Sequence, residues 1–245
     1  AAAISLAALP SLSQHHSRGD GDAFMRTLAA GLRMVWVMSL PAAAALLALA
    51  TPIVSLVFNH GQFTAADQDL TVLALLFYVP GLPFGAVDQV LIFAFYARKN
   101  TWTPVLVGIA AIGVYLVVAW SSIGAMGMAG LVLANTAQLT FHAVVTGVLL
   151  WREMRSEGGL AGYGIGQTAL RALGAAGAMA LLSYGAWQLL DNTLPQDNFI
   201  MEALILGVPA ILGGGLYLAL VWMMRLPEIE LVAGKVAGRL GRLRP

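Results

Sequence analysis

The sequence predicts an all-α polytopic membrane protein, with six full transmembrane helices that follow the end of a truncated one. Of the 245 residues, 59% are hydrophobic and only 10% are charged, whereas a soluble domain carries about 25% charged residues. The mean hydropathy is +0.81, which is typical of chains whose solvent is a lipid bilayer. The apolar runs are continuous rather than alternating, and this pattern favours helices over the strands of a membrane barrel.

The composition also excludes other classes of protein. The formal net charge is +1 and no basic stripe runs along a predicted face, so we expect no nucleic acid among the partners. The chain has no cysteine, which rules out disulfides, thiolate metal sites and a cysteine nucleophile within it.

Six runs are long enough to cross a bilayer, since a spanning helix needs about 20 apolar residues. They cover residues 34–58, 70–97, 103–120, 126–151, 172–190 and 203–224. The apolar stretch 100–151 is too long for one pass and is predicted to divide at 121–124. Residues 1–9 predict the end of a helix whose start is missing, and residues 10–33 predict a cytoplasmic linker. The six runs together form a predicted transmembrane bundle over residues 34–225.

The basic residues predict the orientation of these helices. All 13 Lys and Arg residues precede the first span or follow the second, fourth and sixth, and the loops at 59–69, 121–125 and 191–202 hold none. By the positive-inside rule the basic side is cytoplasmic, which places the C-terminus there. Residues 226–245 combine an apolar stripe with flanking Lys and Arg, which indicates an amphipathic helix on an anionic leaflet or a solvated basic tail.

Prolines interrupt the first two spans at Pro41, Pro52, Pro80 and Pro83. Proline removes a backbone donor and clashes with the preceding turn, and in lipid the freed carbonyl needs a partner from a side chain, a neighbouring helix or water. These positions are therefore candidate hinges, with fixed kinks between packed helices as the alternative.

A few polar residues inside the spans are candidates for a substrate path. Asp88 is the one carboxylate well inside a span and Gln89 follows it. A buried carboxylate is costly there and usually faces a bundle interior or a wet cavity; the alternative is a protonated group that bonds a neighbouring helix. Asn135, Gln138 and His142 share one face of the fourth span at helical spacing, where they line a cavity or hydrogen-bond a neighbour.

No enzyme motif accompanies these residues. The chain lacks H-E-x-x-H, the P-loop pattern and G-x-S-x-G, so zinc proteolysis, phosphate binding at a P-loop and serine hydrolysis have no support. We expect no metal, no cofactor and no catalytic residue, and the pattern favours transport.

Several strings resemble one family. LPSLSQHHSRGDGDAFMRTLAAGLR, ATPIVSLVFNHGQFTAADQDLTVLALLFYVPGLPF, FYARKNTWTPV and GMAGLVLANT are similar, in order and spacing, to helix ends and loops of the MurJ (MviN) lipid II flippases. The likeness runs across most of residues 1–150, and residues 151–245 match in topology and length.

The resemblance implies one lobe of a fourteen-helix exporter fold, the multidrug/oligosaccharidyl-lipid/polysaccharide exporter type. The chain would be the C-terminal half, comprising the end of helix 8 and helices 9 to 14, in a bacterial inner membrane. Its partners would be a lipid-linked cell-wall precursor, membrane lipids and the missing N-terminal lobe. Such proteins move lipid II to the outer leaflet by alternating access, and the family's lipid groove would fall between 172–190 and 203–224.

The sequence departs from the family in two places. No Lys or Arg lies within a predicted span, so this lobe cannot form the whole site for an anionic diphosphate. Asp88 and Gln89 stand near a position where the family often carries Lys or Arg. A related exporter of drugs or polysaccharide lipids, or a non-transporting membrane scaffold of the same fold, stays an alternative.

Overall fold

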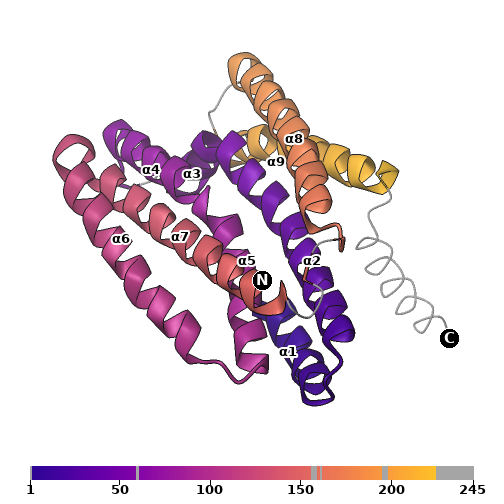
Figure 1. Ribbon diagram of the computed structural model, residues 1–245. Helices are drawn as coiled ribbons and strands as arrows, with labels where there is room; N and C mark the ends of the chain where they lie inside the picture. The colour runs from indigo at the N-terminus through magenta and orange to yellow at the C-terminus, as the bar shows by residue number, and fades with distance from the viewer. Residues whose placement is uncertain (1, 59–60, 156–158, 161, 195–197, 225–245) are drawn as a thin grey trace.

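The computed structural model describes residues 2–58, 61–155, 159–160, 162–194 and 198–224, and within these residues the chain forms only helices and turns (Figure 1). The helices are α1 (Ala2–Ser17), α2 (Gly21–Ala48), α3 (Ala50–Phe58), α4 (Ala65–Tyr78), α5 (Gly81–Ala97), α6 (Trp102–Met126), α7 (Met128–Met154), α8 (Ile165–Thr193) and α9 (Phe199–Met223).

Six helical segments in the described residues are long and apolar enough to cross a membrane, with α4 and α5 together forming one of them. This confirms the predicted all-α fold with six full spans. The predicted tail at 226–245 lies outside the described residues.

The structure moves several helix ends relative to the sequence prediction. Helix α1 continues through Pro10 to Ser17, and only a short turn separates it from α2. Most of the predicted linker at 10–33 is therefore helical. The Asp20 side chain accepts a hydrogen bond from the Ala23 N–H at 3.0 Å, and such an N-cap lets α2 start well before the apolar run.

The division between α6 and α7 falls at Gly127 rather than at 121–124. The hydroxyls of Ser121 and Ser122 donate to the Val118 carbonyl at 3.0 and 2.6 Å, so both serines continue the helix instead of ending it. Gly127 has φ 55°, a conformation that glycine adopts at little cost. A Cβ on Gly130 would lie 2.8 Å from Ser122 Oγ, so the two helices also need glycine where they approach closely.

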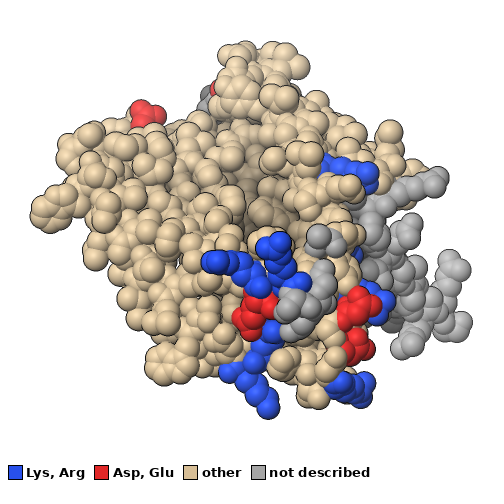
Figure 2. Space-filling view, viewed as in Figure 1, with Lys and Arg blue, Asp and Glu red and all other residues tan. Residues whose placement is uncertain are grey.

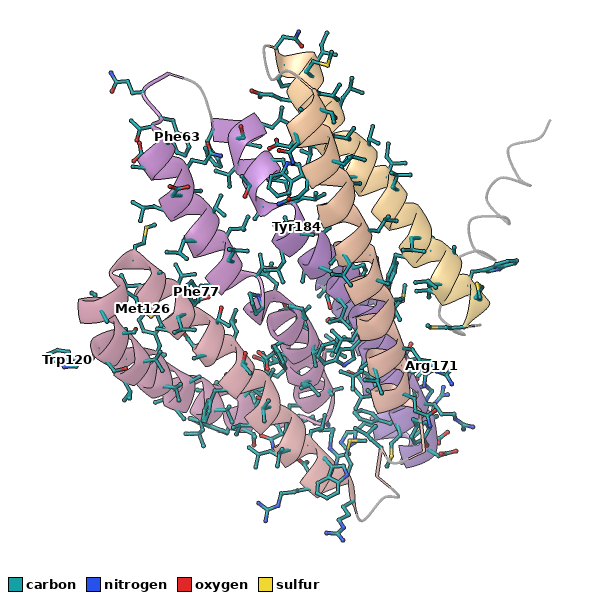
Figure 3. All side chains as sticks on the ribbon, turned by 90° about the horizontal axis from the view of Figure 1, so that it is seen from above. Phe63, Phe77, Trp120, Met126, Arg171 and Tyr184 are labelled. Atoms are coloured by element: carbon teal, nitrogen blue, oxygen red, sulfur yellow. The ribbon has the colours of Figure 1, made fainter. Side chains whose placement is uncertain are left out.

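The helices pack in two groups joined by α2 (Figure 1). One core cluster lies where α1, α2, α5 and α7 meet, around Phe24 and Phe95. The other joins α2 to α8 and α9 around Val37 and Tyr217. Helix α6 packs mainly on α7 and leaves a broad apolar face exposed. Trp120 on that helix is 89% exposed and points away from the bundle (Figure 3).

Charged side chains gather away from the middle of the bundle. On the face drawn in Figure 2, most Lys and Arg lie towards the lower end, near the passages from α1 to α2 and from α5 to α6. At the upper end the charged side chains in view are acidic. Arg171 lies towards the lower end of α8 (Figure 3). Because that helix begins at Ile165, Arg171 stands almost two turns inside it.

Candidate functional site: a polar crossing of three helices

The structure brings together two of the five candidate path residues, Asp88 on α5 and His142 on α7. His142 Nδ1 lies 2.7 Å from Asp88 Oδ1. The Asp88 side chain is 12% exposed and the His142 side chain is 13% exposed. A carboxylate at this depth is expensive unless it is paired and hydrogen-bonded, and the imidazole supplies that partner. The sequence alone indicated each of these residues as a candidate but did not predict that they form a pair.

The second nitrogen of the ring reaches a third helix. His142 Nε2 lies 3.3 Å from the carbonyl oxygen of Pro104 on α6. Gly108, one turn further along α6, faces the ring, and a Cβ there would make an ordinary van der Waals contact with Nε2 at 3.6 Å. The hydroxyl of Thr146 lies 3.3 Å from Nδ1. The imidazole therefore links α5, α6 and α7 at one level of the bundle.

The other three candidates do not join this pair. Asn135 and Gln138 lie on α7 two turns and one turn before His142, and both are partly buried. Gln89 follows Asp88 on α5 and is also partly buried. None of the hydrogen bonds found among the described residues connects these three side chains to the Asp88–His142 pair.

At two of the four candidate hinges, a hydroxyl group of a neighbouring helix binds a nearby backbone carbonyl. Pro41 lies inside the continuous helix α2, where it deprives the Val37 carbonyl of its helical donor; the Tyr217 hydroxyl of α9 donates to that carbonyl at 2.5 Å. Pro80 separates α4 from α5. There the Thr136 hydroxyl of α7 donates to the Phe77 carbonyl at 2.6 Å.

The remaining two prolines occupy first turns, where a missing N–H costs little. Pro52 follows the interruption at Leu49 and lies in the first turn of α3. Pro83 lies in the first turn of α5. Sequence reasoning did not single out Thr136 or Tyr217. The signal that could have found Tyr217 is Pro41 itself, because the Val37 carbonyl that it frees in lipid requires a donor. Phe77 lies only three residues before Pro80, so its bond to Thr136 belongs to the interruption between α4 and α5 and had no such signal in the sequence.

An apolar groove of about 620 Å³ opens between α2, α5 and α8. Trp36, Leu40, Phe84, Leu173 and Gly177 are among its lining residues. Pro80 and Pro83 line it as well, so the α4–α5 interruption forms part of its wall.

Helices α8 and α9 pack directly on each other, whereas the family resemblance implied a lipid groove between them. Ser183 Oγ donates to the Pro209 carbonyl at 3.1 Å. A Cβ on Gly213 would lie only 2.0 Å from Ser183 Oγ. The two helices are close-packed at this level, and the groove lies instead on the side of α8 that faces α2 and α5.

No metal site emerges from the part of the chain that the structure describes, where no group of three or more His, Cys, Asp or Glu side chains could hold an ion. The chemistry available at the polar crossing is hydrogen bonding and proton exchange between a carboxyl and an imidazole.

Comparisons with known proteins give a consistent result. The family model described as "Lipid II flippase MurJ" matches residues 1–207. A "Probable lipid II flippase MurJ" of Vibrio cholerae is 32% identical, over 80% of this chain and 43% of the relative. One of Bdellovibrio bacteriovorus is 27% identical, over 93% of this chain and 42% of the relative.

A solved structure has a similar fold. It is named "Lipid II flippase MurJ, inward closed conformation" and superposes with a TM-score of 0.62 at 20% identity, over 87% of this chain and 42% of that one. The chain thus spans less than half the length of these relatives. Because the family model matches most of its 245 residues, the chain belongs to the MurJ lipid II flippase family.

Proposed function

We propose that this chain is the C-terminal lobe of a lipid II flippase, which carries the lipid-linked peptidoglycan precursor from the inner to the outer leaflet by alternating access. The observation that carries the proposal is the family match over residues 1–207. The transport is not enzymatic, and the membrane is the bacterial inner membrane. The segregated basic residues support a cytoplasmic C-terminus.

The apolar groove between α2, α5 and α8 is the proposed binding site for the polyprenyl chain of the substrate. Its lining is dominated by aliphatic and aromatic side chains and small residues. An apolar chain gains about 0.8 kcal/mol for each CH₂ removed from water, but in a bilayer this gain is absent, so such a groove acts by shape and packing.

The charged part of the substrate requires groups from elsewhere. A diphosphate is best held by Lys and Arg. The apolar runs predicted to span hold neither, and the arginines of the described spanning helices lie outside those runs, at Arg26, Arg33, Arg152 and Arg171. We therefore assign the diphosphate to the N-terminal lobe, across a central cavity. Gln89, Asn135 and Gln138 stay proposed polar contacts along the path.

A pair of glycine substitutions on α8 tests the groove in the complete protein. A Cβ on Gly177 or on Gly185 meets no atom within 4 Å, so leucine fits at both positions, but only Gly177 lines the groove. Overpacking a close-fitting site costs about 1–3 kcal/mol. We therefore expect Gly177→Leu to slow lipid II translocation in proteoliposomes by about tenfold or more. Gly185→Leu is the matched control and should stay near the parent rate.

The outcomes separate the candidate functions. Equal rates for both variants would remove the groove from the substrate path. A parent protein that exports drugs or polysaccharide lipids but does not translocate lipid II would support the related exporter. A parent protein that moves none of these substrates would support the scaffold.

A further inference from the structure

Both hydrogen bonds of the His142 ring are satisfied together only when the polar crossing carries two hydrogens. The carbonyl of Pro104 can only accept a hydrogen bond, so its 3.3 Å contact with Nε2 is a hydrogen bond only when Nε2 carries hydrogen. The 2.7 Å contact between Nδ1 and Asp88 Oδ1 holds a second hydrogen. The pair is then either a carboxylic acid beside a neutral imidazole or a carboxylate beside an imidazolium. Both forms contain the same number of protons and have no net charge.

Loss of one proton is incompatible with this geometry. A neutral imidazole beside a carboxylate has a single N–H for two acceptors, one on α5 and one on α6. The contact to the carboxylate is shorter and charge-assisted, and such bonds are roughly twice as strong as neutral ones. The N–H therefore stays with Asp88, and the lone pair of Nε2 then faces the oxygen of Pro104. Those two acceptors repel each other.

We propose that Asp88 and His142 form a site that binds one exchangeable proton, and that release of this proton detaches α6 at Pro104 from α7. The ligand is the proton itself. The inference goes beyond the flippase proposal, because it concerns the protonation of a three-helix junction and holds whatever the protein transports.

The surroundings isolate the pair from other charges. Among the described residues, His142 is the one charged group that acts on the Asp88 carboxyl, and Thr146 adds only a hydroxyl. The nearest titratable side chain along the same helices is Tyr96 on α5, eight residues after Asp88, which is about 12 Å. The others are ten or more residues away, namely Tyr78 before α5, Arg98 after it, Tyr115 on α6 and Arg152 and Glu153 on α7.

Helices α1 and α2 also pack on α5, and their charged groups lie at its far end. His16 contacts Phe24, and the Arg98 guanidinium lies over the same ring. Four more titratable side chains lie at this end of the bundle, namely His15, Asp22, Arg26 and Arg33. Arg26 pairs with Asp22, which also accepts a hydrogen bond from the Tyr163 hydroxyl, and Arg33 donates to the Tyr163 carbonyl. The proton is therefore shared between two groups only.

Nitrogen NMR of the complete protein in lipid bilayers tests the protonation. With ¹⁵N-labelled histidine, the His142 signal is the one that His142→Gln removes. We expect it to show two hydrogen-bearing ring nitrogens, or one with a strongly hydrogen-bonded Nδ1, and to pass to a single neutral tautomer in one step as the pH rises. In Asp88→Asn this step should change, since the carboxyl group that shares the proton has been removed.

Spin labels on α6 and α7 test the detachment. The chain has no cysteine of its own, and Leu106 and Val144 are both exposed, so cysteines there accept labels without entering the junction. The spin–spin distance should lengthen with the same midpoint as the NMR step. His142→Gln keeps a donor for Pro104 but cannot titrate, so its distance should stay short at every pH.

Two results would overturn the inference. One is a His142 midpoint that is the same in the parent and in Asp88→Asn; the other is a parent distance that does not follow the titration. The distance measurement on the parent needs no substitution at the pair, so it decides the matter even where Asp88→Asn fails to fold. Neither readout involves transport, and failure here leaves the flippase proposal untouched.

Discussion

The Tyr217 hydroxyl on α9 donates to the Val37 carbonyl on α2 at 2.5 Å, and Val37 lies four residues before Pro41. That carbonyl is the one whose helical N–H partner the proline removes. Tyr217 is itself buried in the cluster that joins α2, α8 and α9. The kink at Pro41 and the docking of α9 are thus one feature, because the same hydrogen bond serves both.

Replacing Tyr217 with phenylalanine removes the donor and keeps the ring. The Val37 carbonyl is then buried without a partner, which costs about 1–3 kcal/mol. We expect a lower midpoint of thermal unfolding for Tyr217→Phe in detergent, followed by tryptophan fluorescence.

The second half of that experiment removes the proline. In a Pro41→Ala background, the new N–H of residue 41 can bond the Val37 carbonyl within the helix, so Tyr217→Phe should cost less than half as much. Such coupling between contacting residues is about 0.5–3 kcal/mol. An equal cost in both backgrounds would show that the hydroxyl does not serve the proline.

Thr136 has the corresponding role at the interruption between α4 and α5. Its hydroxyl donates to the carbonyls of Phe77 and Tyr78 at 2.6 and 3.3 Å, while the Leu82 N–H turns to Val79. Thr136→Val preserves the shape of the side chain but leaves these carbonyls without that donor. We expect a loss of about 1–2 kcal/mol in the free energy of unfolding, measured by denaturant titration in mixed micelles.

Thr71→Val is the matched control for this substitution. The Thr71 hydroxyl donates to the Asp67 carbonyl in its own helix and is exposed, so its loss should change stability by less than about 0.5 kcal/mol. A Thr136→Val variant as stable as Thr71→Val would mean that water or another group satisfies the interruption.

The sequence was sufficient for the six spans because each is an apolar run of the required length, and only Asp88 places a charged group inside one of them. The sequence also identified Asp88 and His142 as candidates, because each is a polar residue within an otherwise apolar run. It could not pair them, because the two residues are 54 positions apart and their meeting depends on how α5 crosses α7. The α6–α7 boundary was predicted wrongly at Ser121 and Ser122 for a related reason. Their hydroxyls donate to the Val118 carbonyl one turn earlier, so the helix continues through them.

A hydrogen bond between the start of α2 and the segment before α8 gives a pH-dependent prediction. The Tyr163 hydroxyl donates to Asp22 Oδ1 at 2.6 Å, and this bond to a carboxylate raises the pKa of the Tyr163 phenol above its usual value. The folded-state pKa is the higher one, so the contact is present at neutral pH and is lost as the pH rises through that pKa. In Asp22→Asn the phenol should titrate earlier.

The absorbance of phenolate near 295 nm measures this titration, and Tyr163→Phe identifies the contribution of this residue. Asp22 is exposed and Tyr163 is partly buried, so high salt should weaken the effect in the parent protein. A Tyr163 titration that is identical with and without the Asp22 carboxylate would show that the contact is absent in solution.

The three consecutive glycines of α9 differ sharply in their surroundings. A Cβ on Gly213 would lie 2.0 Å from Ser183 Oγ and 3.2 Å from the Met179 carbonyl oxygen, whereas a Cβ on Gly214 or Gly215 would meet nothing within 4 Å. To admit a methyl group at 213, Ser183 must rotate and give up its bond to the Pro209 carbonyl, or α8 and α9 must separate. Overpacking of this kind costs about 1–3 kcal/mol.

We therefore expect Gly213→Ala to lower the thermal unfolding midpoint clearly, while Gly214→Ala and Gly215→Ala leave it unchanged or raise it. The controls gain the preference of helices for alanine over glycine, about 0.5–1 kcal/mol, without a steric penalty. Adding Ser183→Ala to Gly213→Ala removes the nearest obstacle and should recover part of the loss. If all three glycines tolerated alanine equally, α8 and α9 would have to be separable at this level, and the space between them would again be open to a lipid chain.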